Sequence, residues 1–252
     1  MRLLFPKNIY TSLLAAVMPA QLKESVIFKE ASVISSELEQ GNADIALIPS
    51  CDLLKHSGFF VSSKIAISFD GFLSNAYFYF LPDQNKFTDI FLSGDVTTNE
   101  IILSKILFKE KYSSDVQMHL DTGKADYSTR NYLVVGDSNL DNSKFDHGLS
   151  FSDELSEMLF LPYVNFIAVS KDEAFIQKFN EELSEIDVLI EDNVDTMLHK
   201  FSLNENSREL IKNNLNSVYF EMTDSEVDGL KELLQLPYYH GLLDDMVEIK
   251  FV

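Results

Sequence analysis

The chain has 252 residues, 46% of them hydrophobic, and its 40 acidic and 20 basic residues give a formal charge of −20. Nonspecific nucleic-acid binding needs a basic surface, so this composition disfavours it, and we expect no nucleic-acid partner. No apolar run approaches the ~20 residues that span a bilayer, and the N-terminal residues make a poor secretory signal, so we expect a cytoplasmic protein without a membrane span.

Cysteine and histidine usage argues against disulfides and metal sites. Cys51 is the only cysteine, so it has no partner for an intramolecular disulfide. The five histidines lack the short spacing of zinc sites, and no acidic segment matches a calcium loop. Because Walker A, G-x-G-x-x-G and G-x-S-x-G motifs are also absent, the sequence predicts neither a metal nor a nucleotide site.

The first fifty residues predict a βαβαβ unit with a parallel sheet. Its elements are strands at 3–5, 25–29 and 44–48 and helices at 10–18 and 32–40. Gly41 ends the second helix, because a positive φ costs glycine nothing, and the apolar run that follows is typical of a strand buried on both faces. Pro49 and Ser50 end that strand at its carboxyl edge, where open α/β sheets bind ligands.

The middle of the chain predicts a second α/β unit, after strands at 65–68 and 76–80. Its elements are strands at 90–92, 116–120 and 132–135 and helices at 97–111 and 155–159. A strand at 163–169 leads back to the first unit, and helical segments at 172–200 and 224–234 follow. We therefore expect two α/β lobes, one formed by 1–80 and 170–252 and the other by 81–169, that close over a ligand cleft.

Polar residues at predicted strand ends are the candidates for ligand binding. Thr97 and Thr98 open a helix whose free N–H groups suit a carboxylate, with ordinary helix capping as the alternative. Ser68 and Asn75 lie near another strand end, where a simple turn is the alternative. Because the chain has only three arginines, we expect hydroxyls, backbone amides and a few lysines to hold an anionic ligand.

Four segments at the ends of predicted strands carry a resemblance to a known family. They are GNADIALIPS at 41–50, ISFDG at 67–71, LVVGD at 133–137, and FDHG at 145–148 followed by LPYV at 161–164. In this order they resemble the chorismate dehydratase family of the futalosine route to menaquinone. The resemblance implies a two-lobed fold like type II periplasmic-binding proteins. It also implies cofactor-free elimination of water from chorismate to an aromatic enolpyruvyl ether.

The resemblance also indicates which residues meet the substrate. It gives catalytic positions to Asn8 and Asn75 and substrate-binding positions to Thr11, Ser50, Ser68, Thr97, Thr98 and Asp137. The sequence departs from the family pattern in the register of the segment PKNIYTS at 6–12, and Asn75 replaces a common serine. Asp95 and Val96 stand where the family has a serine and an arginine, and the loss of that arginine next to an added aspartate disfavours a dicarboxylate. Since Asn and Thr are poor bases, the substrate's own carboxylate is the expected base.

Two other interpretations stay open. A fold of this kind also suits a non-catalytic binding protein for a small organic anion, so a small-molecule carboxylate is the expected partner in both cases. The acidic segment 172–200 also suits contact with a basic protein, although a solvated helix face is the simpler interpretation. The sequence is compatible with either a homodimer or a monomer.

Overall fold

The computed structural model describes residues 1–84, 86–123 and 125–252, leaving aside the side chains of 142–144 and 146, and its strands form two separate sheets. The larger sheet has the strand order β11–β4–β10–β3–β1–β2, with β12 paired to β4. Its strands are β1 (Leu3–Pro6), β2 (Val26–Lys29), β3 (Ile45–Pro49), β4 (Phe60–Phe69), β10 (Tyr163–Ser170), β11 (Val218–Glu221) and β12 (Lys250–Phe251).

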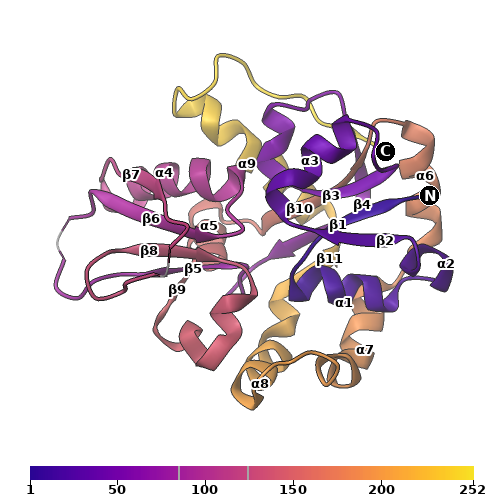
Figure 1. Ribbon diagram of the computed structural model, residues 1–252. Coiled ribbons are helices and arrows are strands. Elements are labelled where there is room, and N and C mark those ends of the chain that lie inside the picture. The colour runs from indigo at the N-terminus through magenta and orange to yellow at the C-terminus, as the bar shows by residue number, and fades with distance from the viewer. Residues whose placement is uncertain (85, 124) are drawn as a thin grey trace.

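The smaller sheet has the order β7–β6–β8–β5–β9. Its strands are β5 (Ala76–Tyr79), β6 (Asp89–Gly94), β7 (Gln117–Leu120), β8 (Tyr132–Val135) and β9 (Leu149–Ser150). Figure 1 shows the two sheets side by side, with both ends of the chain on the side of the larger one. The chain therefore builds two α/β units, each around its own sheet.

Helices pack around both sheets (Figure 1). They are α1 (Ile9–Val17), α2 (Ala20–Lys23), α3 (Ala31–Glu39), α4 (Thr98–Tyr112), α5 (Phe151–Leu159), α6 (Glu173–Glu182), α7 (Ile186–Leu198), α8 (Glu205–Asn214) and α9 (Asp224–Tyr239), with 3-10 turns η1 (Ser50–Leu54), η2 (Asp137–His147) and η3 (Leu215–Ser217). Helix α9 contacts β10 as well as α4 and α5, so it bridges the two sheets. Within the described residues, no helix is long and apolar enough to cross a membrane.

The predicted βαβαβ start is confirmed. β1 pairs in parallel with both β2 and β3, and every residue of β3 is buried. Gly41 has a φ of 79° and follows α3, as its place in the sequence predicts. The apolar run at 45–48 and its glycine stop thus position the strand end at Pro49.

The larger sheet is mixed rather than parallel throughout. β10 runs antiparallel to both β3 and β4. The chain leaves this sheet at the end of β4, where Phe69 lies opposite Tyr163 at the start of β10. Because the exit and the return lie side by side, the two strands must run in opposite directions.

The segment 172–200 was expected to be continuously helical, but it forms two helices, α6 and α7. Leu183 has an extended backbone, and Glu185 has a φ of 56°, in the left-handed region. Burial of Leu183 and Ile186 on both sides of this turn offsets the strain of a non-glycine residue there. Without glycine or proline, the sequence carries no local signal for the break.

The predicted lobe boundaries at 80/81 and 169/170 do not coincide with the two sheets. They would put β5 with the larger sheet and β10 with the smaller one. β5 pairs with β8 and β9 in the smaller sheet, whereas β10 pairs with β3 and β4 in the larger one. The chain therefore crosses between sheets after β4 and again before β10. The division of the chain into lobes itself stays a prediction.

Candidate functional site

Loops from both sheets meet along a line that we call the seam, formed by residues 6–9, 30–32, 49–51, 74–75, 94–99 and 136–137. Direct hydrogen bonds cross it. Asp137 accepts from the amide of Ile9 at 3.0 Å, and the Asn99 side-chain oxygen accepts from the amide of Cys51 at 2.8 Å. The Tyr10 hydroxyl donates to the carbonyl of Ser74 at 3.3 Å. The seam therefore joins the carboxyl ends of β1 and β3 to the loops after β6 and β8.

Asn8 and Thr11 complete the start of α1. The Asn8 side chain accepts from the amide of Thr11 at 2.9 Å, as an N-cap residue does. The Thr11 hydroxyl donates to the carbonyls of Pro6 and Asn8. Both residues lie where the sequence predicts, and both polar side chains already have partners within α1 and its entry loop.

Asn75 lies just before β5, and its side-chain oxygen, unlike those of Asn8 and Thr11, has no partner among the described residues. Its backbone carbonyl accepts from the amide of Gly136 at 2.7 Å, which places Asn75 beside the loop that carries Asp137. The residue is only 8% exposed. Among the described residues, its side-chain oxygen is a buried acceptor without a hydrogen-bond partner. A buried amide oxygen without a donor is costly, so it marks a place where a donor from a ligand would bind favourably.

Asp137 begins η2, and its carboxylate reaches the first amide of α1. Desolvation by the surrounding protein groups raises the pKa of Asp137 to about 6, although the residue keeps exposed surface. The hydrogen bond from Ile9 and the charge of Lys7 act in the opposite direction and favour the carboxylate. The pKa of this carboxyl group is therefore closer to neutral than that of an ordinary aspartate.

Ser50 and Ser68 are connected through β10. The Ser50 hydroxyl donates to the carbonyl of Val164 at 2.6 Å, and Val164 pairs with Ser68 in the sheet. The Ser68 hydroxyl lies 3.5 Å from the carbonyl of Tyr219, its acceptor on β11. Both serines are fully buried in the larger sheet. Ser50 borders the seam, whereas Ser68 faces the neighbouring strand.

Thr97 and Thr98 begin α4. Thr97 is the N-cap, and its amide and hydroxyl both donate to Glu100 at 2.7 Å in a capping box. Glu100 is 1% exposed, and this burial raises its pKa. Thr98 is half-buried. The carboxylate of Glu100 thus already holds the Thr97 groups that were expected to meet a ligand.

Two residues of the seam were not among the predicted site residues. Asn99 donates to the Tyr163 hydroxyl and to both oxygens of Asn165, so it fixes α4 to β10. Asp95 accepts from the amides of Ala31 and Ser32, the latter at 3.2 Å. The sequence signal for Asp95 was its departure from the family serine, and Asn99 carried no signal beyond its place at a helix start.

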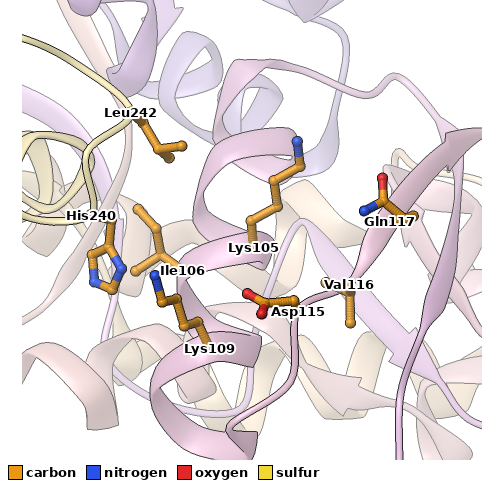
Figure 2. Close-up of a pocket in the computed structure, with 8 residues that line it drawn as sticks. All are labelled: Lys105, Ile106, Lys109, Asp115, Val116, Gln117, His240 and Leu242. Carbon is orange, nitrogen blue, oxygen red and sulfur yellow. The ribbon is translucent and has the colours of Figure 1, made fainter.

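The cavity shown in Figure 2 lies away from the seam. It has a volume of about 340 Å³ and is formed by α4, the segment that leads into β7, and the end of α9. Its lining residues are Lys105, Ile106, Lys109, Asp115, Val116, Gln117, His240 and Leu242. None of the eight predicted site residues lines this cavity, so the seam and the cavity are separate features.

Solved structures confirm the expected two-lobed periplasmic-binding-protein-like fold. Protein AF1704 from Archaeoglobus fulgidus superposes with a TM-score of 0.72 at 13% identity, over 96% of this chain and 98% of that one. An ABC transporter from Parabacteroides distasonis gives 0.65 at 14% identity, over 100% and 98%. The alkanesulfonate-binding protein SsuA from Xanthomonas axonopodis, bound to MOPS, gives 0.66 at 9% identity, over 100% and 97%.

The family is shown by sequence. No curated protein matches the chain. A family model described as menaquinone biosynthesis, however, matches residues 8–239, which include the whole smaller sheet and most of the larger sheet and of the seam. The chain therefore belongs to the menaquinone biosynthesis family, as the resemblance to chorismate dehydratases predicts.

Proposed function

We propose that the protein is a chorismate dehydratase-type lyase of menaquinone biosynthesis, whose substrate binds at the seam between the two lobes. The observation that carries this proposal is the group formed by Asn75, Asp137 and the start of α1. Three groups that can meet a polar substrate lie together there. They are an unpartnered buried amide oxygen, a carboxyl group and the start of helix α1, whose first amide this carboxyl group now holds.

The reaction is an elimination in which a ring C–H bond and the neighbouring C–O bond break. The electrons of the C–H bond form the new ring double bond, and the proton and hydroxide leave as water. The ring becomes aromatic while the enolpyruvyl ether is kept. The protein therefore needs to orient the substrate, exclude bulk water and place an acceptor near the proton.

Asn75 is suited to orient the leaving hydroxyl group. Its side-chain oxygen is an acceptor without a donor, so a substrate O–H would satisfy it. The substrate's own carboxylate remains the proposed base. Asp137, whose pKa is raised to about 6, lies at the same end of α1 and is suited to take up or return the proton afterwards.

Incubation of the purified protein with chorismate tests the proposal. We expect the chorismate absorbance to fall and mass spectrometry to detect a product lighter by one water. Asn75→Leu should lower kcat by about 100-fold, the size of effect seen when a positioned polar group is lost. Asn75→Ser, which restores the serine implied for the family, should keep turnover within about tenfold.

Thermal unfolding separates catalysis from folding. Leucine removes a buried acceptor that has no partner, so Asn75→Leu should be at least as stable as the natural protein. Unchanged chorismate together with an unchanged melting temperature at saturating chorismate would exclude the proposal. Stabilisation by chorismate without turnover would instead favour the non-catalytic binding protein.

The location and the lobe division follow from this function as further proposals. A biosynthetic step on a metabolite such as chorismate favours a cytoplasmic protein. For closure over a substrate, we propose that the lobes divide where the chain crosses between sheets, after Phe69 and before Tyr163. These crossings are the natural hinge positions, because the backbone there leaves one sheet for the other.

A further inference from the structure

Charged side chains without partners line the cavity shown in Figure 2. Lys105 and Lys109 lie one turn apart on α4, and within the part of the chain that the structure describes neither ammonium group has an ion-pair or hydrogen-bond partner. Lys111 on the same helix, by contrast, is paired with two glutamates at 2.8 Å. The carboxylate of Asp115 has no such partner among the described residues either. The cavity therefore holds charges of both signs that are too far apart to pair with each other.

The uncharged part of the lining is aliphatic. Ile106 of α4 and Val116, which precedes β7, are buried, with 1% and 5% of their surface exposed. Leu242 lies in the segment after α9 and is 47% exposed. A ligand that covers Leu242 removes apolar surface from water, which favours an occupant with an apolar part.

His240 fixes the wall of the cavity that the end of α9 contributes. It is the C-cap of that helix, and its Nε2 lies 3.3 Å from a carboxylate oxygen of Glu110 on α4. Gln117 adds an amide, which can donate and accept hydrogen bonds. With a volume of about 340 Å³, the cavity is within the range of roughly 300–1,000 Å³ that is typical of small-molecule sites. The two walls are thus connected to each other and leave room for a small ligand.

The pattern of charges selects among classes of ligand. Exposed lysines by themselves are commonly solvated and indicate no ligand. A simple anion would pair with the two lysines but would be repelled by Asp115, and a simple cation would meet the reverse. A zwitterion satisfies both signs at once, and an aliphatic group on the same molecule matches the rest of the lining.

We propose that this cavity binds an α-amino acid with an aliphatic side chain. Its carboxylate pairs with Lys105 and Lys109, its ammonium group pairs with Asp115, and its side chain packs on the aliphatic residues of the lining. The inference goes beyond the proposed function, because the cavity is separate from the seam and binding involves no turnover.

Three probes of nearly the same shape test the two charges separately. L-leucine carries an ammonium group, a carboxylate and an aliphatic side chain. Isocaproate lacks the ammonium group, and isoamylamine lacks the carboxylate. Isothermal titration calorimetry measures how each probe binds to the protein. We expect saturable binding of L-leucine with a Kd of about 1 mM or below, and binding of the other two probes that is weaker by about tenfold or more.

Substitutions in the cavity should remove these preferences one at a time. Asp115→Asn should abolish the preference for L-leucine over isocaproate, because the ammonium group loses its partner. The double variant Lys105→Gln with Lys109→Gln should abolish the preference for L-leucine over isoamylamine, because the carboxylate loses both of its partners. The matched control is Lys200→Gln, which changes an exposed lysine that does not line this cavity and should leave all three affinities unchanged.

Failure of L-leucine to bind the natural protein at concentrations up to about 10 mM would overturn the proposal. Equal binding of L-leucine and either analogue would overturn it too, as would cavity variants that behave like Lys200→Gln. The substituted side chains are exposed, so we expect unchanged melting temperatures, and the comparison of the three probes on the natural protein needs no variant. Chorismate turnover enters none of these measurements, so this proposal and the proposed function can fail separately.

Discussion

The N-termini of α3 and α4 lie on opposite sides of the seam and are completed in opposite ways. Helix α4 closes itself, because Thr97 and Glu100 form a capping box within one turn. Helix α3 depends on Asp95, which is 64 residues away from Ala31 in the sequence. The first cap forms wherever α4 forms, whereas the second exists only while the two lobes are together. The comparison separates residues that stabilise the fold from residues that set the lobe arrangement.

The largest expected loss of stability comes from replacing Asn99. This residue lies in the first turn of α4, and its side chain forms hydrogen bonds across the seam. Asn99→Ala removes bonds to Cys51, Tyr163 and Asn165, all within a buried region. Since buried partners are left without hydrogen bonds, we expect a loss of about 3 kcal/mol in the free energy of unfolding. Urea denaturation measures it.

Asn193→Ala is the matched control for this change. Asn193 is exposed on α7, and its side chain donates to the carbonyl of Leu189, one turn back. Its replacement should change stability by less than about 0.5 kcal/mol. Similar losses for both variants would mean that the Asn99 network does not fix α4 to the larger lobe.

The second prediction compares the cap that α4 forms with its own residues and the cap that Asp95 provides for α3. Glu100→Ala leaves the amide and hydroxyl of Thr97 without their acceptor in a buried place, and should cost about 2 kcal/mol of unfolding free energy. Asp95→Ala should cost less than about 1 kcal/mol, because losing its bonds to α3 also relieves its repulsion of buried Glu100. Chemical denaturation of both variants measures the two losses of unfolding free energy.

The capping box of α9 provides the reference for Glu100. Glu226 accepts from the amide and hydroxyl of Thr223 and is 3% exposed, so Glu226→Ala should lose a similar amount of stability. If Asp95→Ala proved as destabilising as these two variants, the distinction between caps that stabilise the fold and caps that join the lobes would be wrong.

The same distinction explains what could be predicted from the sequence. The stop at Gly41 and the buried strand after it are local patterns, and both are confirmed. The cap of α3 is not local, because nothing near Ala31 shows that Asp95 will reach it. The left-handed turn at Glu185 was missed for a related reason, since burial of its neighbours rather than a glycine holds it.

The candidate site divides in the same way. Most predicted residues do lie at the seam, because strand ends can be found from apolar runs and the polar residues that follow them. Their partners could not be predicted. Thr11 and Ser50 donate to backbone carbonyls, and only the folded structure shows that Asn75 has a buried oxygen without a donor. The sequence locates polar residues, but their free hydrogen-bonding capacity depends on packing.

The smallest predicted effect concerns a third helix start, that of α7. Its N-cap Glu185 makes no capping bond, and the carboxylate of Asp187 in its first turn accepts instead from Phe220 at 2.7 Å and Glu221 at 3.4 Å on β11. Burial raises the pKa of Asp187 to about 6. Because the folded state binds this proton more tightly than the unfolded chain, Asp187 should reduce stability as the pH rises from about 4 to about 6.

Asp187→Asn measures this effect, since asparagine resembles the protonated acid. Solvent screening reduces the effect of a partly exposed carboxylate, so we expect the variant to gain about 1 kcal/mol relative to the natural protein between pH 4.5 and pH 7.5. Urea denaturation at both pH values gives the difference, and Asp192→Asn on the exposed face of α7 is the control. A pH-independent difference would contradict the raised pKa. The bonds from β11 would then fully offset burial, and Asp187 would accept from the strand as a charged group, as Asp95 does from a helix.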